Sequence, residues 1–269
     1  MDYDYTTIGH VTVDVLADGR EQPGGGAFYS ALQAAALGLR ALIVTRGEPR
    51  EIERLLDPFA SRLEVIVQRA PSTTRLETSG DGIDRRQRVL AWAGPLEPVG
   101  ALSTEICHLA PVVREVAAPW PRGGRFRAAT PQGLVRRWDR EGVIEACAMS
   151  AADALLGDSL DAAALNARER PLCDALVARA LAGGAVIAVT DEGDANVIAH
   201  GGREEFVVPE PLAVARQDIG AGDVYAAAFF IALAGGAAPV ESARRANRAA
   251  HGRMSSSDPS TVISALEAS

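Results

Sequence analysis

A glycine-rich turn followed by an aspartate is the stretch of this sequence best suited to chemistry. Gly220-Ala221-Gly222-Asp223 precedes an alanine-rich apolar run that ends at Ala234, and such a run without breakers predicts a buried helix. The first N–H groups of a helix have no intrahelical acceptor and attract anions. The turn therefore predicts an anion hole for a phosphoryl group at Gly220, Ala221 and Gly222, with Asp223 as general base toward a hydroxyl. The alternative is a plain glycine turn whose Asp complements the helix dipole.

The composition limits the class of protein and its partners. A chain of 269 residues fits one large α/β domain. Its formal net charge of −8 argues against nucleic acid or an anionic membrane as the main partner. Cys107, Cys147 and Cys173 lack metal-type spacing and predict reduced thiols of a cytoplasmic protein. No apolar run is long enough to span a bilayer, and the first residues lack a signal-peptide core.

Strand and helix patterns alternate along the chain and would position the glycine turn. Thr6 to Asp14 reads as a first strand, and Pro23-Gly24-Gly25-Gly26 opens an apolar helix that ends near Leu37. This alternation predicts a mostly parallel, doubly wound sheet with helices on both faces, in a single domain over residues 1–269. A hairpin is expected at about residues 72–93, around Gly80-Asp81-Gly82. Further strands are expected at residues 40–46, 63–68, 106–110, 126–129 and 185–190, with a hairpin over 196–208 and a last helix near 261–267.

Several of these motifs, in this order, resemble the ribokinase-like (PfkB) carbohydrate kinases. The turn at 220–223 is similar to the C-terminal signature of that family, and Gly24-Gly25 is similar to its glycine pair. The resemblance implies a three-layer α/β/α fold and transfer of the γ-phosphoryl group of ATP, with Mg²⁺, to a hydroxyl of a sugar, cyclitol or nucleoside-like compound. It also implies that Asp14, Gly24 and Gly25 bind the acceptor, with a turn or cap role as the alternative for Asp14. Because only a short segment at 16–22 stands where larger members carry a strand pair, we expect a lid reduced to the 72–93 hairpin.

Two further positions on the acceptor side are assigned through the same resemblance. Tyr29 stands where the family often has Asn, so its ring is expected either to stack on a sugar or cyclitol face or to belong to the core. Thr130 to Arg136 resembles an Asp-Pro-Gln-Gly-x-x-Arg run of some members, with Thr130 in place of Asp. This implies that Arg136 contacts substrate or a phosphate oxygen; the alternative is a solvated helix face with Arg137 and Arg140.

The metal and nucleotide residues also follow from the resemblance. Asp158 and Asp161 stand where the family carries Asn-x-x-Glu, which implies a role in the Mg²⁺ environment. Helix capping by Asp158, with Asp161 in the first turn, is the alternative. Asn247 lies on the helix that usually walls the adenine pocket. The residues assigned to the nucleotide are Thr190, Glu192, Gly193 and Asn247.

Departures from the family pattern keep a second interpretation open. Gln217-Asp218-Ile219 replaces the Asp-x-Thr that precedes the glycine turn in the family, which argues against a family-type monovalent-cation site. Glu192 replaces a glycine beside the phosphates. The alternative to a kinase is a catalytically weakened ribokinase-like protein with a ligand-binding or regulatory role, and a homodimer is compatible with either. A dinucleotide oxidoreductase is disfavoured because no Gly-x-Gly-x-x-Gly follows the first strand.

Overall fold

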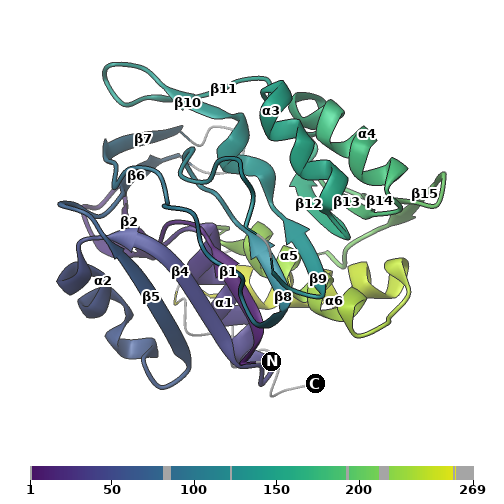
Figure 1. Cartoon of the computed structure of the whole chain (residues 1–269), viewed down its shortest axis with the longest axis horizontal. Helices are drawn as coiled ribbons and strands as arrows, with labels where there is room; N and C mark the ends of the chain where they lie inside the picture. Colours follow the sequence, from purple (N-terminus) through teal and green to yellow (C-terminus); the bar gives the residue numbers. More distant parts are fainter. Residues whose placement is uncertain are drawn as a thin grey trace.

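A large sheet forms the centre of the molecule (Figure 1). The computed structural model describes residues 2–80, 86–121, 123–191, 194–211, 218–256 and 258. Within them the sheet has nine strands in the order β15-β14-β13-β12-β9-β8-β1-β4-β5. The strands from β13 to β5 in this order pair in parallel, and β14 and β15 continue antiparallel at one edge. Their bounds are β1 (Tyr3–Ile8), β4 (Ala41–Gly47), β5 (Leu63–Arg69), β8 (Thr104–Leu109), β9 (Phe126–Ala129), β12 (Ala162–Asn166), β13 (Val186–Thr190), β14 (Asn196–His200) and β15 (Arg203–Val207).

Helices cover both faces of this sheet (Figure 1). Strand β4 shows why both faces need cover. Successive side chains of a strand point to opposite faces, so Ile43 packs into the hydrophobic cluster of one face while Leu42 and Val44 pack into that of the other. The three-layer α/β/α arrangement confirms the predicted fold. One face carries α1 (Gly26–Ala36), α2 (Pro49–Leu56), α5 (Ala221–Ala234) and α6 (Pro239–Met254), and the other carries α3 (Ala151–Ala154) and α4 (Asp174–Ala182).

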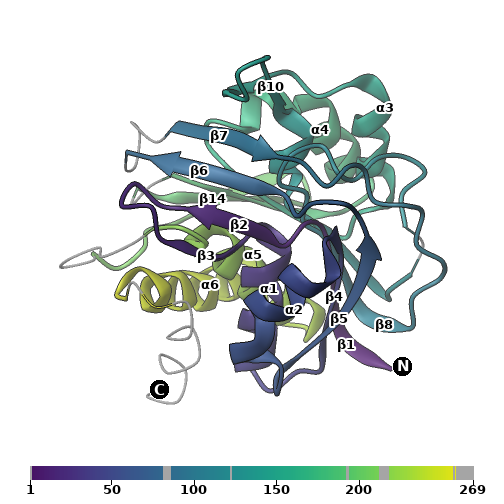
Figure 2. The ribbon, with the colours of Figure 1, turned by 90° about the vertical axis from the view of Figure 1, so that its left-hand side faces the viewer.

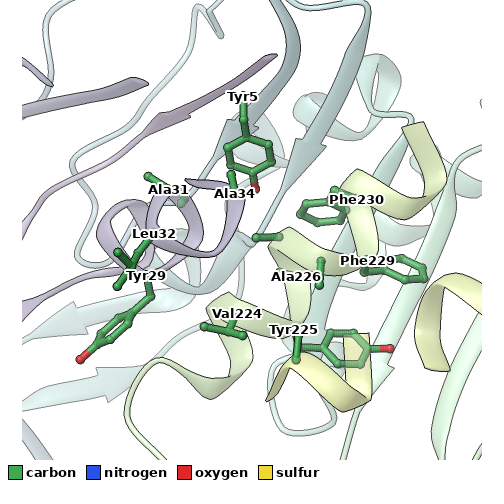
Figure 3. Close-up of a cluster of buried hydrophobic side chains, with 14 of the residues drawn as sticks. Tyr5, Tyr29, Ala31, Leu32, Ala34, Val224, Tyr225, Ala226, Phe229 and Phe230 are labelled. Atoms are coloured by element: carbon green, nitrogen blue, oxygen red, sulfur yellow. The ribbon is translucent and has the colours of Figure 1, made fainter. Parts of the chain in front are cut away.

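Helices α1 and α5 pack against each other in the larger core. Figure 3 shows Tyr29 and Leu32 of α1 beside Val224 of α5, with Phe230 further along α5 on the side of Tyr5. All four of these helix side chains are buried. Because α5 is apolar on every side, it must be enclosed by neighbours, and α1, α6 and the sheet enclose it. This packing holds the N-termini of α1 and α5 together at one edge of the sheet.

A second sheet differs from the prediction. Its four strands, in the order β3-β2-β6-β7, lie side by side in Figure 2. The predicted hairpin accounts for β6 (Arg75–Ser79) and β7 (Arg86–Ala91), but the expected reduction of the lid to that hairpin is wrong, because β2 (Thr12–Val15) and β3 (Glu21–Gly24) add a strand pair. The turn of the hairpin at 81–82 lies outside the described residues.

The predicted first strand divides in two. Gly9 follows β1 and lies very close to the backbone that follows β8. A Cβ atom on Gly9 would be 2.2 Å from the carbonyl oxygen of Ala110. The chain leaves the main sheet at this point and enters the second sheet as β2, so Asp14 belongs to the lid rather than to the end of a central strand. The other predicted strands are confirmed, while the helix expected near 261–267 lies outside the described residues.

Two smaller expectations can also be compared with the structure. Arg136 lies on β10 (Arg136–Trp138), which pairs with β11 (Ile144–Ala146), so the helix suggested for this segment is wrong. Cys107, Cys147 and Cys173 are free thiols, and the first and last of them are buried. Among the described residues, no helix combines the length and apolarity needed to cross a membrane.

Candidate active site

A cavity of about 220 Å³ lies between the lid, the N-terminus of α5 and the carboxyl ends of β12 and β13. Open α/β sheets bind ligands at this edge. The cavity brings together residues that are far apart in the sequence, from both ends of the chain. The residues predicted from the sequence that line it are Asp14, Gly25, Tyr29, Arg136, Thr190, Gly220, Gly222 and Asp223.

Asp223 occupies the first turn of α5 and lines the cavity. Burial raises the pKa of its carboxyl group to about 7, and the negative charges of Glu169 and Asp14 add to this rise, while Arg136 opposes it. The backbone beside it is held in place, since the Ser30 hydroxyl donates to the carbonyl oxygen of Asp223 at 3.2 Å. A carboxylate with a pKa near neutrality can both accept and release a proton at physiological pH.

The glycine turn presents backbone donors to the same cavity. Gly220 has φ +80°, which L side chains rarely adopt, and it begins α5 as its N-cap. Within the described chain, the N–H groups of Gly222 and Asp223 have no acceptor, as expected in a first helical turn. The N–H of Ala221 instead donates to the carbonyl oxygen of Asp218 at 3.1 Å. Of the three residues predicted to offer backbone donors, Ala221 therefore has its N–H engaged, and the N–H of Asp223 is directed to no acceptor among the described residues.

Asp14 and the glycine pair form the lid side of the cavity. Asp14 is 4 % exposed, and its carboxylate accepts a hydrogen bond from the Thr12 hydroxyl at 2.6 Å. A Cβ atom on Gly24 would lie 2.1 Å from this carboxylate, and one on Gly25, where φ is +92°, would lie 2.3 Å from the carbonyl oxygen of His10. Both glycines are thus needed for the close packing of β3 and α1 around Asp14, and Gly25 also lines the cavity.

Tyr29 does not have the exposed ring that a stacking role requires. The residue is 1 % exposed, and a Cβ atom on Gly220 would lie 2.5 Å from its ring. The guanidinium carbon of Arg253 lies 5.2 Å from the ring centroid, and the Gln22 side-chain amide donates to the Tyr29 hydroxyl at 3.4 Å. The core interpretation therefore replaces the stacking one, and Tyr29 packs against the glycine turn.

Arg136 stands at the entrance to β10 and lines the cavity. Its guanidinium donates to the carbonyl oxygen of Val112 at 3.3 Å, and its charge lowers the pKa of Asp223. The side chain is therefore close enough to act on the proposed base. A guanidinium here can also bind phosphate oxygens.

The carboxylates assigned to the metal do not reach the cavity. Asp158 forms a two-point ion pair with Arg179, with N–O distances of 2.6 and 2.7 Å, and Asp161 accepts from the backbone N–H of Arg127 at 2.7 Å. Both residues precede β12, at the edge of the sheet opposite the cavity, and residues 155–159 form a short 3₁₀ helix. The assignment of Asp158 and Asp161 to a metal is therefore wrong.

An Asn-x-x-Glu sequence lies at the correct edge of the sheet, at residues 166–169. Asn166 ends β12, and both Asn166 and Glu169 line the cavity. The side-chain amide oxygen of Asn166 accepts from the Glu169 N–H at 2.9 Å, and the Glu169 carboxylate accepts from the Asn166 N–H at 3.3 Å. This reciprocal arrangement, known as a capping box, orients the carboxylate. Sequence reasoning missed this pair, although the literal motif after an Ala-Ala-Ala-Leu strand was a usable signal.

The donor side is described only in part. Thr190 ends β13 and lines the cavity, whereas Glu192 and Gly193 lie outside the described residues. Asn247 lies in a second cavity of about 400 Å³ on α6 and accepts a hydrogen bond from the Asn196 amide at 2.7 Å. Gln132, which sequence reasoning did not assign, lines the first cavity and donates to Glu169 at 2.9 Å.

Comparisons with known proteins identify the fold. No family model and no curated protein matches the chain. A sulfate complex of a pyrophosphate-dependent kinase in the ribokinase family aligns over 98 % of this chain and 100 % of its own, with 20 % identity and a TM-score of 0.81. A myo-inositol kinase that depends on pyrophosphate aligns over 98 % of both chains, with 19 % identity and a TM-score of 0.77. Adenosine kinase from Sinorhizobium meliloti aligns over 100 % of both, with 18 % identity and a TM-score of 0.70. The chain therefore has the ribokinase-like fold that its sequence motifs implied.

Proposed function

We propose that this protein is a kinase that transfers a phosphoryl group from a polyphosphate donor to a hydroxyl group of a small sugar, cyclitol or nucleoside-like acceptor. One observation carries the proposal. A single cavity contains the Asp223 carboxylate, whose pKa is raised to about 7, and the helix N-terminus with the unpaired N–H groups of Gly222 and Asp223, among the described residues, on the side opposite the lid. Phosphoryl transfer needs a base beside an anion site, and this cavity supplies both.

Each residue of the cavity has a role in this proposal. Asp14 accepts hydrogen bonds from acceptor hydroxyls, and Asp223 takes the proton from the hydroxyl that attacks. The N–H groups of Gly222 and Asp223 bind the oxygens of the transferred phosphoryl group. Arg136, which also lines the cavity, adds positive charge and stabilises the charge that develops during transfer.

Mg²⁺ is part of the proposal. The described residues contain no group of three His, Cys, Asp or Glu side chains that could cage a metal. Mg²⁺ usually keeps several waters and binds one or two carboxylates together with substrate phosphates, and Glu169 and Asn166 in the cavity fit such a site. Bound there, Mg²⁺ would neutralise donor phosphate charge. Glu169 would hold its hydration shell.

Two donors are candidates, ATP and pyrophosphate. ATP follows from the sequence motifs, with Thr190 beside its phosphates. Pyrophosphate is favoured by the second cavity, where an adenine would lie against α6. Among the described residues, the lining of that cavity has Val208 as its one aliphatic side chain, against Arg244, Arg248 and His251. Pockets for purines are mostly apolar. Two of the similar structures that are described as pyrophosphate-dependent kinases also have higher TM-scores, 0.81 and 0.77, than adenosine kinase at 0.70.

The test is phosphoryl transfer to a panel of cyclitols, sugars and nucleosides, with ATP and pyrophosphate compared at equal Mg²⁺. ³¹P NMR would identify the phosphate ester directly, and Asp223→Asn protein from the same preparation would exclude a contaminating kinase. Transfer by the wild-type protein alone supports the proposal. If neither donor is consumed while a polyol or nucleoside still binds in calorimetry, the ligand-binding or regulatory alternative replaces it.

A further inference from the structure

The segment from Thr130 to Arg136 brings two polar side chains to the first cavity. Gln132 and Arg136 both line it. The charge of Arg136 acts on Asp223, whereas the Gln132 side-chain amide donates to a carboxylate oxygen of Glu169 at 2.9 Å. One short segment therefore acts on two acidic side chains of the proposed site.

Backbone contacts fix the position from which Gln132 reaches the cavity. Gln132 belongs to a short 3₁₀ helix, Pro131–Val135. The N–H of Gly133 donates to the carbonyl oxygen of Pro111 at 2.9 Å, and the Gly133 carbonyl oxygen accepts from the N–H of Arg114 at 3.2 Å. A Cβ atom on Gly133 would lie 2.5 Å from the carbonyl carbon of Pro111, so the two backbones are in direct contact. The residue next to Gln132 is therefore held on both of its backbone polar groups.

The Glu169 carboxylate accepts one hydrogen bond at each of its two oxygens. The Gln132 amide donates to Oε1, and the backbone N–H of Asn166 donates to Oε2 at 3.3 Å. These two donors come from different elements, the 3₁₀ helix and the carboxyl end of β12. Rotation of the carboxylate would break both bonds, so together they fix its plane. A carboxylate has about four lone-pair sites, so both oxygens keep acceptor capacity.

Gln132 orients this carboxylate without neutralising it. A Lys or Arg side chain at the same place would form an ion pair with Glu169, whereas an amide carries no charge. The negative charge of Glu169 also reaches Asp223, because it adds to the rise in the pKa of that carboxyl group. A charged carboxylate in a fixed orientation is suited to hold the waters of a hydrated Mg²⁺.

We propose that Gln132 is a positioning residue, which acts through Glu169 and fixes its carboxylate toward the hydration shell of Mg²⁺. The inference rests on the proposed function, because Glu169 belongs to the proposed metal site. Direct contact of Gln132 with the donor is the rival explanation, since Gln132 itself lines the cavity. The two explanations differ in whether Gln132 still matters once the charge of Glu169 has been removed.

The first experiment measures metal binding by electron paramagnetic resonance, with Mn²⁺ in place of Mg²⁺ and with pyrophosphate or ATP present. Gln132→Met removes the amide at similar volume. Gln68→Met is the matched control, because the Gln68 amide donates to the carbonyl oxygen of Glu97 at 3.1 Å from β5, the strand at the far edge of the sheet. We expect the Mn²⁺ dissociation constant to rise roughly 3–10-fold in Gln132→Met, and the control to bind as the wild-type protein does. A purely structural role predicts a lower Tm with unchanged Mn²⁺ affinity.

A double-mutant cycle separates action through Glu169 from direct contact with the donor. Gln132→Met is combined with Glu169→Gln, and Mn²⁺ affinity is measured in the wild type, both single variants and the double variant. If Gln132 acts through Glu169, Gln132→Met should change the affinity of the Glu169→Gln protein by less than about twofold. An equal fold-change in both backgrounds would show direct contact and overturn the proposal.

The same measurements separate failure of this inference from failure of the proposed function. If the wild-type protein binds no Mn²⁺ with either donor, the proposed metal site is refuted, and the role of Gln132 with it. If the wild type binds Mn²⁺ and folded Gln132→Met binds it equally well, only the role of Gln132 is refuted. Should Gln132→Met not fold, Gln132→Asn decides, because its shorter side chain cannot keep the 2.9 Å contact with Glu169. Wild-type Mn²⁺ affinity in Gln132→Asn would then contradict the proposal.

Discussion

Gly26 and Asp223 both line the cavity and lie in close contact. A Cβ atom on Gly26 would lie 2.9 Å from a carboxylate oxygen of Asp223. Helix α1 therefore begins directly against the first turn of α5, and Ser30, one turn further along α1, binds the backbone of Asp223. The contact places the carboxylate between α1 and α5, two helices whose residues are mostly buried. This enclosure is the physical cause of its raised pKa.

Asp223→Asn tests the role of the carboxylate as a base. The amide keeps the size of the side chain but cannot accept the proton of an attacking hydroxyl. We expect kcat to fall by about 10²–10⁴-fold, with donor and acceptor affinity nearly unchanged. Single-turnover assays together with calorimetry would measure both quantities. Substantial kcat in this variant would refute the assignment of Asp223.

The pH dependence of activity and of stability follows from the raised pKa of Asp223. Activity requires the ionised form, so kcat/KM should rise with pH through an apparent pKa near 7. The stability of the folded state should instead fall as pH rises. The folded pKa of about 7 exceeds the ordinary value of 3.8, so the folded state binds more protons between these values, and this contribution to stability is lost as pH rises through 7.

Asparagine does not ionise, so Asp223→Asn should not lose stability as pH rises through 7. The melting temperature of this variant therefore tests the raised pKa independently of activity. At pH 8 the variant should melt a few degrees above the wild-type protein, corresponding to roughly 1–2 kcal/mol after discounting for solvent on the cavity side. At pH 4 the two should melt together. A carboxylate that only complements the helix dipole predicts the reverse, a loss of about 0.3–1 kcal/mol in the variant at pH 8.

The two glycines of the turn should respond differently to alanine. At Gly220, φ is +80° and an added Cβ atom would lie 2.5 Å from the Tyr29 ring, so Gly220→Ala should cost at least about 2 kcal/mol in unfolding free energy. At Gly222 no atom lies within 4 Å of the added Cβ atom. Gly222→Ala should keep or raise stability, by up to about 1 kcal/mol, but its methyl group faces the cavity and should lower kcat/KM for the donor. Denaturant unfolding and kinetics of both variants would test this contrast, and equal stability of the two would contradict it.

Glu169→Gln tests the metal assignment, with Asp158→Asn as the matched control. Glutamine keeps the shape of Glu169 but removes its charge from the cavity. The Mg²⁺ concentration for half-maximal activity should rise by roughly 10-fold, as for other residues that hold the outer shell of a metal. Because Glu169 raises the pKa of Asp223, the acid limb of the pH profile should also move to lower pH.

Asp158 pairs with Arg179 on the surface, so Asp158→Asn should change stability by about 0–1 kcal/mol and leave the Mg²⁺ titration unchanged. Titrations of Mg²⁺ against activity in both variants would distinguish the two positions. A shift in the Asp158 variant alone would restore the assignment made from the sequence.

Features encoded by neighbouring residues could be predicted from the sequence. The Gly220 to Asp223 turn combines a left-handed backbone position with the start of an apolar helix, and both are local properties of the chain. The alternation of strand and helix patterns likewise predicted the parallel sheet with two covered faces. These are the parts of the prediction that the structure confirms.

Errors arose where the role of a segment depends on its neighbours in space. Residues 154–157 and 162–165 are both short apolar runs, and only sheet pairing decides that the second forms a strand. The Asn-x-x-Glu sequence that follows this strand is Asn166 to Glu169, not Asp158 to Asp161. The lid pair β2 and β3 was missed because its strands are four residues long and carry little periodicity of their own.

The sequence by itself determined the turn, its aspartate and the class of fold, because local backbone preferences and hydrophobic periodicity act over a few residues. Only the tertiary structure decided the surroundings of that turn. It placed Tyr29 beneath Gly220 and the guanidinium of Arg253 against the Tyr29 ring. It also enclosed Asp223 enough to raise its pKa to about 7. Burial and charge proximity sum over residues distant along the chain, and chain folding alone brings those residues together.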